Sequence, residues 1–162
     1  MTHSFTVSAV IPATPKAIYD CWLTGRGHAQ MTGTNSATAS TKVGAKYTAW
    51  DGYIAGRNVA LVPGKKIVQS WRTTEFSAAD EDSQIAVTFA ATARGTKVTL
   101  THSNVPDSHQ TYQSGWVDHY FEPMKVYFAA MAAKPKVKKK PAKAKAKAKP
   151  KRKPAKRALK RK

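Results

Sequence analysis

The chain has 162 residues, with 28 lysines and arginines against 9 aspartates and glutamates, and its formal net charge is +19 at pH 7. Such an excess points to a polyanionic partner, either nucleic acid or an anionic membrane surface. A single cysteine, Cys21, excludes an internal disulfide framework. Because no stretch approaches the roughly 18 apolar residues of a membrane span, and the first residues lack a secretory signal, we expect a cytoplasmic protein with no membrane span.

The positive charge is concentrated at the C-terminus. Residues 134–162 hold 17 of the 28 basic residues and none of the 9 acids, so residues 1–133 carry 11 basic and 9 acidic residues, a net +2. A body of this length is an ordinary size for one domain. The sequence therefore predicts a domain over residues 1–133 and a polycationic tail over residues 134–162.

The first elements follow from alternation and capping. Apolar and polar residues alternate from Phe5 to Ile11, which predicts a half-buried strand. Thr14 and Pro15 fit the N-cap and first position of a helix, which we expect to stop at Gly25. From there to Pro106 the pattern is that of strands joined by short turns, at residues 46–50, 53–62, 66–73, 84–91 and 96–102.

After Pro106 the pattern returns to that of a helix. Large apolar residues recur at steps of three or four, at Tyr112, Trp116, Tyr120, Met124, Phe128 and Met131. Pro123 lies inside this run and is expected to kink it, and Gly56 inside a strand indicates a bulge. The order of elements predicts an α+β domain, in which a curved antiparallel sheet wraps around one long C-terminal helix.

Four blocks of sequence resemble a known family. They are DGYIAGRN at 51–58, PGKKIVQSWR at 63–72, GTKVTLTHS at 95–103 and Gly115-Trp116. Together they resemble the homologues of the activator of the heat-shock protein 90 ATPase. The resemblance implies the START-like (SRPBCC) helix-grip fold, shared with polyketide cyclases and lipid-transfer domains, and a hydrophobic cavity between the sheet and the long helix.

The implied cavity has seven candidate lining residues, which are mostly aromatic: Tyr47, Trp50, Trp71, Phe89, His102, Trp116 and Tyr120. His102 continues an inward-facing series from Val98 and Leu100, so its imidazole could contact a ligand or carry a proton. Core packing explains the aromatic residues as well, and a histidine bonded to Ser103 or to the backbone explains His102.

Catalytic and metal chemistry have little support in the sequence. His3, His28 and His109 share no metal-ligand spacing, and we expect no metal, no cofactor and no catalytic residue. Asp118 and His119 are neighbours on the last helix, so at most one is expected to face the cavity. A non-enzymatic protein is favoured. The alternatives are a cyclase- or aromatase-like enzyme and a cochaperone that activates a chaperone ATPase.

The tail is rich in lysine, alanine and proline and has too few apolar residues to fold alone. Its composition resembles the tails of linker histones and bacterial histone-like proteins. Lysine outnumbers arginine 14 to 3 and no aromatic residue is present, which favours sequence-independent contact with DNA phosphates. Ribosomal RNA, polyphosphate, acidic proteins and anionic lipid stay open as partners. The candidate contacts are Lys134, Lys136, Lys138, Lys139, Lys140, Lys143, Lys145, Lys147, Lys149, Lys151, Arg152, Lys153, Lys156, Arg157, Lys160, Arg161 and Lys162.

These features together predict a START-like domain that binds a small apolar ligand or a protein partner, possible partners including a chaperone. The tail would tether this domain to DNA and place the protein on the nucleoid or on chromatin.

Overall fold

A computed structural model describes residues 1–134, so the predictions made for residues 135–162 lie outside the described residues. The elements follow the predicted order, with one helix added. They are β1 Thr2–Ile11, α1 Pro15–Trp22, α2 Gly25–Thr32, β2 Lys46–Ala49, β3 Ile54–Val62, β4 Lys66–Thr73, β5 Ser83–Thr92, β6 Gly95–Pro106, α3 Tyr112–Trp116, η1 Val117–Phe121 and α4 Glu122–Ala133.

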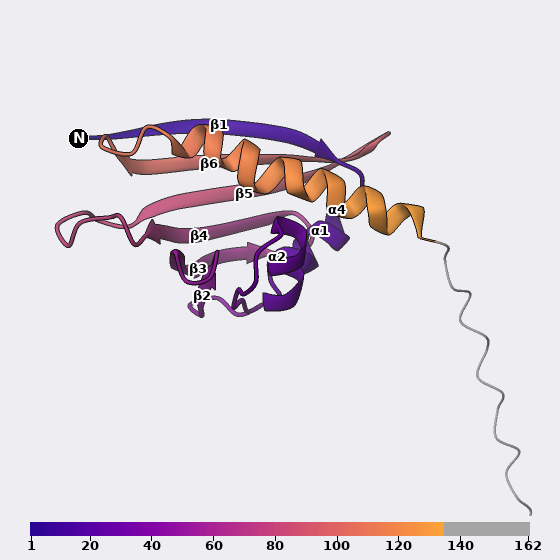
Figure 1. Ribbon diagram of the computed structural model, residues 1–162, viewed down its shortest axis with the longest axis horizontal. Helices are drawn as coiled ribbons and strands as arrows, with labels where there is room; N and C mark the ends of the chain where they lie inside the picture. The colour runs from indigo at the N-terminus through magenta and orange to yellow at the C-terminus, as the bar shows by residue number, and fades with distance from the viewer. Residues whose placement is uncertain (135–162) are drawn as a thin grey trace, which may run out of the picture.

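The six strands form one antiparallel sheet in the order β1-β6-β5-β4-β3-β2. The long C-terminal helical run crosses one face of this sheet, and α1 and α2 lie on the same side (Figure 1). Alternate residues of the strands point toward the helices, as the burial pattern of β5 shows. The predicted architecture, a curved antiparallel sheet with a C-terminal helix across it, is confirmed.

Both N-terminal helices begin at a threonine cap. Thr14 accepts a hydrogen bond from the backbone N–H of Ala17 at 3.2 Å, as the sequence predicts. The first helix ends at Trp22, close to the predicted stop at Gly25. The prediction that only strands follow is wrong, because Gly25 is the first residue of a second helix, α2. Thr24 caps α2 through the N–H of Gly27 at 3.2 Å. A side chain at Gly25 would meet the carbonyl oxygen of Ala37 at 2.5 Å, so glycine is required there by close packing.

The C-terminal run is three segments in place of one kinked helix. Between α3 and α4 lies a π-helical turn, η1, in which the N–H of Glu122 bonds to the carbonyl of Val117. Pro123, which has no N–H, sits where the π-turn returns to α-helix. Met131, the last residue of the predicted apolar series, is 48% exposed, and the C-terminal end of α4 extends past the sheet (Figure 1).

The predicted bulge at Gly56 is also wrong. Gly56 pairs regularly with Tyr47, and the register shift in β3 falls between Asn58 and Ala60. Glycine is needed because the Tyr47 side chain crosses over this position to donate a 2.7 Å hydrogen bond to the carbonyl of Ser70. A Cβ at Gly56 would lie 1.9 Å from that same carbonyl oxygen.

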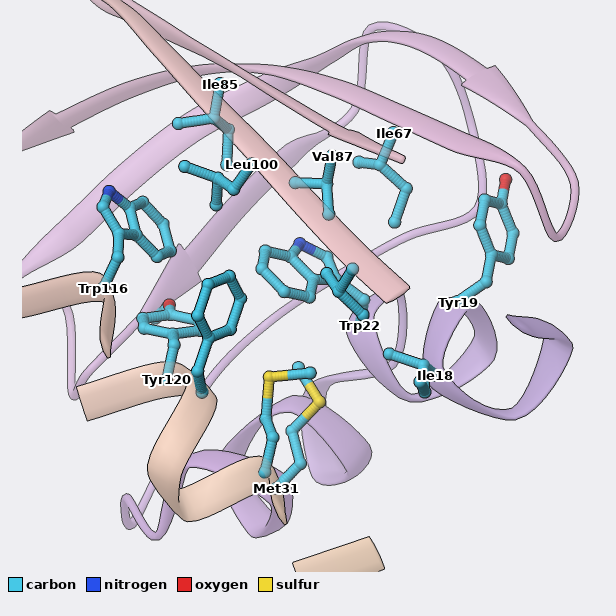
Figure 2. Packing of buried hydrophobic residues seen from close by; sticks show 14 of the residues in the cluster. Ile18, Tyr19, Trp22, Met31, Ile67, Ile85, Val87, Leu100, Trp116 and Tyr120 are labelled. Atoms are coloured by element: carbon cyan, nitrogen blue, oxygen red, sulfur yellow. The ribbon is translucent and has the colours of Figure 1, made fainter. Parts of the chain in front are cut away.

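The core lies between the sheet and the helices, with Trp22 of α1 near its centre (Figure 2). Its indole ring stacks on Trp116 at 6.4 Å between ring centroids, and its Nε1 donates to Gln69 Oε1 at 3.3 Å. Met31 of α2 reaches the same cluster. Within residues 1–134, no helix is both long and apolar enough to cross a membrane.

Candidate functional site

A pocket of about 320 Å³ lies where the turn between β2 and β3 approaches α3 and η1. Its wall is largely aromatic. It is formed by Trp50, Tyr53, Ile54, Trp71, Thr111, Tyr112, Ser114, Gly115, Trp116, Asp118, His119 and Tyr120.

Four of the seven predicted cavity residues line this pocket, namely Trp50, Trp71, Trp116 and Tyr120. The other three lie elsewhere in the core. Tyr47 is held by its bond to Ser70, and Phe89 packs edge-on against Tyr19 at 6.0 Å, away from the pocket wall.

His102, the third, is buried in a chain of hydrogen bonds. Its Nδ1 accepts from Trp116 Nε1 at 3.0 Å, so its proton is on Nε2, which donates to Ser83 Oγ at 2.8 Å. The Ser83 hydroxyl donates in turn to the carbonyl of Trp71 at 2.6 Å. Burial, with a smaller contribution from the charge of His3, lowers the pKa of His102 to about 3. Both ring nitrogens are occupied, and the neutral imidazole joins β5 and β6 to α3.

A second buried histidine, for which the sequence suggested no role, supports the pocket from behind. His28 Nδ1 donates to the carbonyl of Trp22 at 3.0 Å, so its Nε2 accepts from the Tyr120 hydroxyl at 3.0 Å. Burial lowers the pKa of His28 to about 4 and raises the pKa of Tyr120. Tyr120 therefore presents its ring to the pocket while its proton is directed at His28. The N-cap residue Thr24 is the sequence signal that could have predicted α2, and with it the position of His28 on a helix.

Two indole N–H groups on the pocket wall form no hydrogen bond of standard geometry within residues 1–134, although the Trp50 side chain lies close enough to the Tyr120 hydroxyl to influence its pKa. They are the buried Nε1 atoms of Trp50 and Trp71. A buried donor without a partner costs about 1–3 kcal/mol. Such groups are uncommon in native structures and are often found at functional sites.

The backbone at Trp50 is strained. Trp50 and Asp51 both have positive φ angles, 53° and 56°, and Gly52 follows at 89°. The turn is closed by the N–H of Tyr53 bonding to the carbonyl of Trp50 at 3.1 Å. The Asp51 carboxylate anchors it by accepting from the N–H of Ser36 at 2.7 Å. A non-glycine residue in the left-handed backbone region costs of order 1–3 kcal/mol, and residues strained in this way are concentrated at functional sites.

The mouth of the pocket carries Asp118 and His119, which are both exposed. Both residues line the pocket, whereas at most one of them was expected to face the cavity. The His119 ring packs edge-on against Trp50 at 5.3 Å. No group of three potential metal ligands occurs in the described residues.

A family model described as Activator of Hsp90 ATPase homolog 1-like protein matches residues 12–129. The chain belongs to this family. The matched region begins directly after β1, contains β2 to β6 and the helices as far as residue 129 of α4, and includes the pocket.

Individual relatives agree with this assignment. The chain is 31% identical over 97 residues to an activator of 90 kDa heat shock protein ATPase homolog from Dictyostelium discoideum, an alignment that covers 59% of the chain but 25% of that relative. The chain thus spans about a quarter of the length of this curated relative.

Solved structures share the fold of this domain. An HSP90 activator from Plasmodium falciparum superimposes with a TM-score of 0.70 at 22% identity, covering 78% of this chain and 96% of that one. An AHSA1-like protein from Aeromonas hydrophila superimposes with a TM-score of 0.64 at 19% identity, covering 80% and 94%.

Proposed function

We propose that the Hsp90-activator-like domain binds a small, largely apolar ligand that carries two hydrogen-bond acceptors, without catalysing a reaction on it. The observation that carries this proposal is the pair of buried, unpaired indole N–H groups of Trp50 and Trp71 on one pocket wall. An acceptor on the ligand would satisfy each of them.

The chemistry of the wall supports binding more than turnover. Aromatic faces from Trp116 and Tyr112 offer stacking surface. The histidines nearest the core are neutral and hydrogen-bonded on both nitrogens, and the Tyr120 proton is held by His28. The backbone of the turn at Trp50 is held by the hydrogen bond from Ser36 to Asp51 before a ligand arrives, which reduces the entropy lost on binding.

The test is a fluorescence titration of the full chain with 8-anilino-1-naphthalenesulfonate, an aromatic probe that carries sulfonate acceptors. Trp50→Phe keeps an aromatic ring but removes one N–H, and should weaken binding about 2- to 10-fold. Gly115→Leu should abolish it, because the space beside Gly115 is open toward the pocket. The matched control Tyr19→Phe, in the core outside the wall, should bind like the parent. Unchanged binding by both pocket variants would show that the probe binds elsewhere.

We further propose that residues 134–162 tether the domain to DNA through phosphate contacts. The supporting observation is the 17 basic residues and no acids in this segment. With about ten phosphates engaged, log affinity against log salt should have a slope near −9. A chain ending at Ala133 should lose this binding while keeping its fold, since the core cluster ends at Phe128. A slope close to zero for the full chain contradicts the tether.

A cochaperone role is a second candidate, favoured by family membership and by the Dictyostelium relative. It predicts that the full chain raises the ATPase rate of an Hsp90-type chaperone. A full chain that leaves the ATPase rate unchanged when it is added in excess over the chaperone excludes the role.

A further inference from the structure

The domain is nearly neutral, yet most of its basic side chains form no salt bridge with a described acidic residue. Three of its 11 basic residues form salt bridges, Lys16 with Asp20, Arg72 with Asp82 and Lys125 with Glu122. The other eight are exposed and form no salt bridge with any described residue. They are Arg26, Lys42, Lys46, Arg57, Lys65, Lys66, Arg94 and Lys97.

The acids gather at one end of the sheet. Six of the nine lie in the connections at the end where β2, β4 and β6 finish, and a seventh, Asp118 of η1, lines the pocket near that end: Asp51, Glu75, Asp80, Glu81, Asp82, Asp107 and Asp118. The two acids found elsewhere, Asp20 and Glu122, are each paired with a lysine. The opposite end therefore has no unpaired carboxylate.

That opposite end is formed by two hairpins. The β3–β4 turn carries Lys65 and Lys66, and the β5–β6 turn carries Arg94 with Lys97 just beyond it. We call these four residues the hairpin patch. Helix α4 ends toward the same end of the sheet as these two hairpins (Figure 1).

We infer that the hairpin patch is a second contact surface for duplex DNA, and that it binds the phosphates of the same duplex that the tail engages. This inference rests on the proposed tether. A tail bound to DNA keeps the adjoining end of the domain at high local concentration near the duplex. The unpaired positive charge of the patch is then attracted to the phosphates, and the acids at the far end are repelled.

Duplex phosphate fits the patch better than an unpaired base does. The turn sequences VPGKK at 62–66 and TARGTK at 92–97 contain no aromatic side chain on which a base could stack. The inferred contact therefore orients the whole domain. The pocket, bounded by Trp50 and Asp118 toward the acidic end, faces away from the DNA and stays open to ligand.

The experiment measures binding of the full chain to a mixed-sequence 30-base-pair duplex over a range of salt concentrations. Replacing all four residues of the patch by glutamine (K65Q/K66Q/R94Q/K97Q) should reduce the magnitude of the slope by about 3.6, or about 0.9 for each lost phosphate contact. The double variant R94Q/K97Q should reduce it by about 1.8. The matched control K42Q/K46Q removes two exposed charges on the β2 edge and should leave the slope unchanged.

The outcomes separate the two proposals. A wild-type slope near zero overturns the tether, and the patch with it. A steep wild-type slope that R94Q/K97Q and K42Q/K46Q change equally overturns the patch and leaves the tether standing. A patch effect seen on single-stranded RNA but not on the duplex overturns DNA as the partner. Circular dichroism of each variant confirms that the fold is retained.

Discussion

Trp116 Nε1 donates a 3.0 Å hydrogen bond to His102 Nδ1, and this bond joins α3, at the start of the C-terminal helical run, to strand β6 of the sheet. It also fixes the imidazole tautomer, because an indole N–H can only donate. The pocket wall and the sheet core are thereby coupled through one side-chain pair.

Removing this donor should destabilise the domain. Trp116→Phe leaves His102 Nδ1 buried without a partner, which costs about 1–3 kcal/mol in the free energy of unfolding, in addition to lost packing. Trp50→Phe is the matched control, because its N–H forms no hydrogen bond of standard geometry in the described residues, and should cost less than about 1 kcal/mol. Urea denaturation at pH 7 measures both. Equal losses from the two variants would show that the hydrogen bond adds nothing.

Stability should fall as the pH is lowered below about 6.5. The pKa values of His28 and His102 are about 4 and about 3 in the folded protein, well below the ordinary value of 6.5. Between these values the unfolded chain binds protons that the folded chain does not, so unfolding becomes easier as the pH drops. Between its folded and unfolded pKa values, each histidine contributes a slope of about 1.4 kcal/mol per pH unit to the free energy of unfolding. Below the folded pKa of the histidine this slope falls to zero, because both states are then protonated.

The pH effect is measured by urea denaturation between pH 7 and pH 5. His28→Gln removes one of the two groups and should roughly halve the slope contributed by the histidines, although it also lowers the stability at pH 7. A parent protein whose unfolding free energy is the same at both pH values would contradict the burial of the two neutral rings.

Gly56→Ala should be strongly destabilising, by on the order of 2–4 kcal/mol, because the added methyl group overlaps the carbonyl of Ser70 and the ring of Tyr47. Gly115→Ala is the matched control. The space beside Gly115 is open, with its nearest contact at 4.0 Å, and alanine in α3 should be neutral or stabilising by up to about 1 kcal/mol. Thermal unfolding compares the two. A tolerated alanine at 56 would mean that the β4 backbone at Ser70 and the Tyr47 ring can both move away from this position.

Local pattern was enough to predict the strands and their turns. The alternation from Phe5 to Ile11 and the turn residues at Asp51-Gly52 and Pro63-Gly64 each restrict the backbone directly. Helix α2 was missed because Gly25 is typical of a helix end, and the reason for a glycine there, the close approach of Ala37, is a tertiary contact. Thr24 and Gly33 were the local signals of its ends.

The site was less predictable for a similar reason. Aromatic residues at inward positions identify a core, but which of them keeps an unpaired N–H depends on neighbours distant in sequence. Trp116 finds His102 and Trp22 finds Gln69, whereas Trp50 and Trp71 form no hydrogen bond of standard geometry in the described residues. The π-turn that contains Asp118 and His119 was equally hard to predict, since a step of four residues fits either helix type.

The π-turn at Val117–Phe121 holds one residue more than an α-helical turn, and this sets the rotational phase between the two ends of the run. Deleting one residue there would turn α3 by about 100° relative to α4 and draw it in by about 1.5 Å. Trp116 would then no longer line the pocket or donate its hydrogen bond to His102, while Met124 and Phe128 would stay packed in the core. The shape of the binding wall is therefore set by a single inserted residue, and it can change without disturbing the helix that holds the domain together.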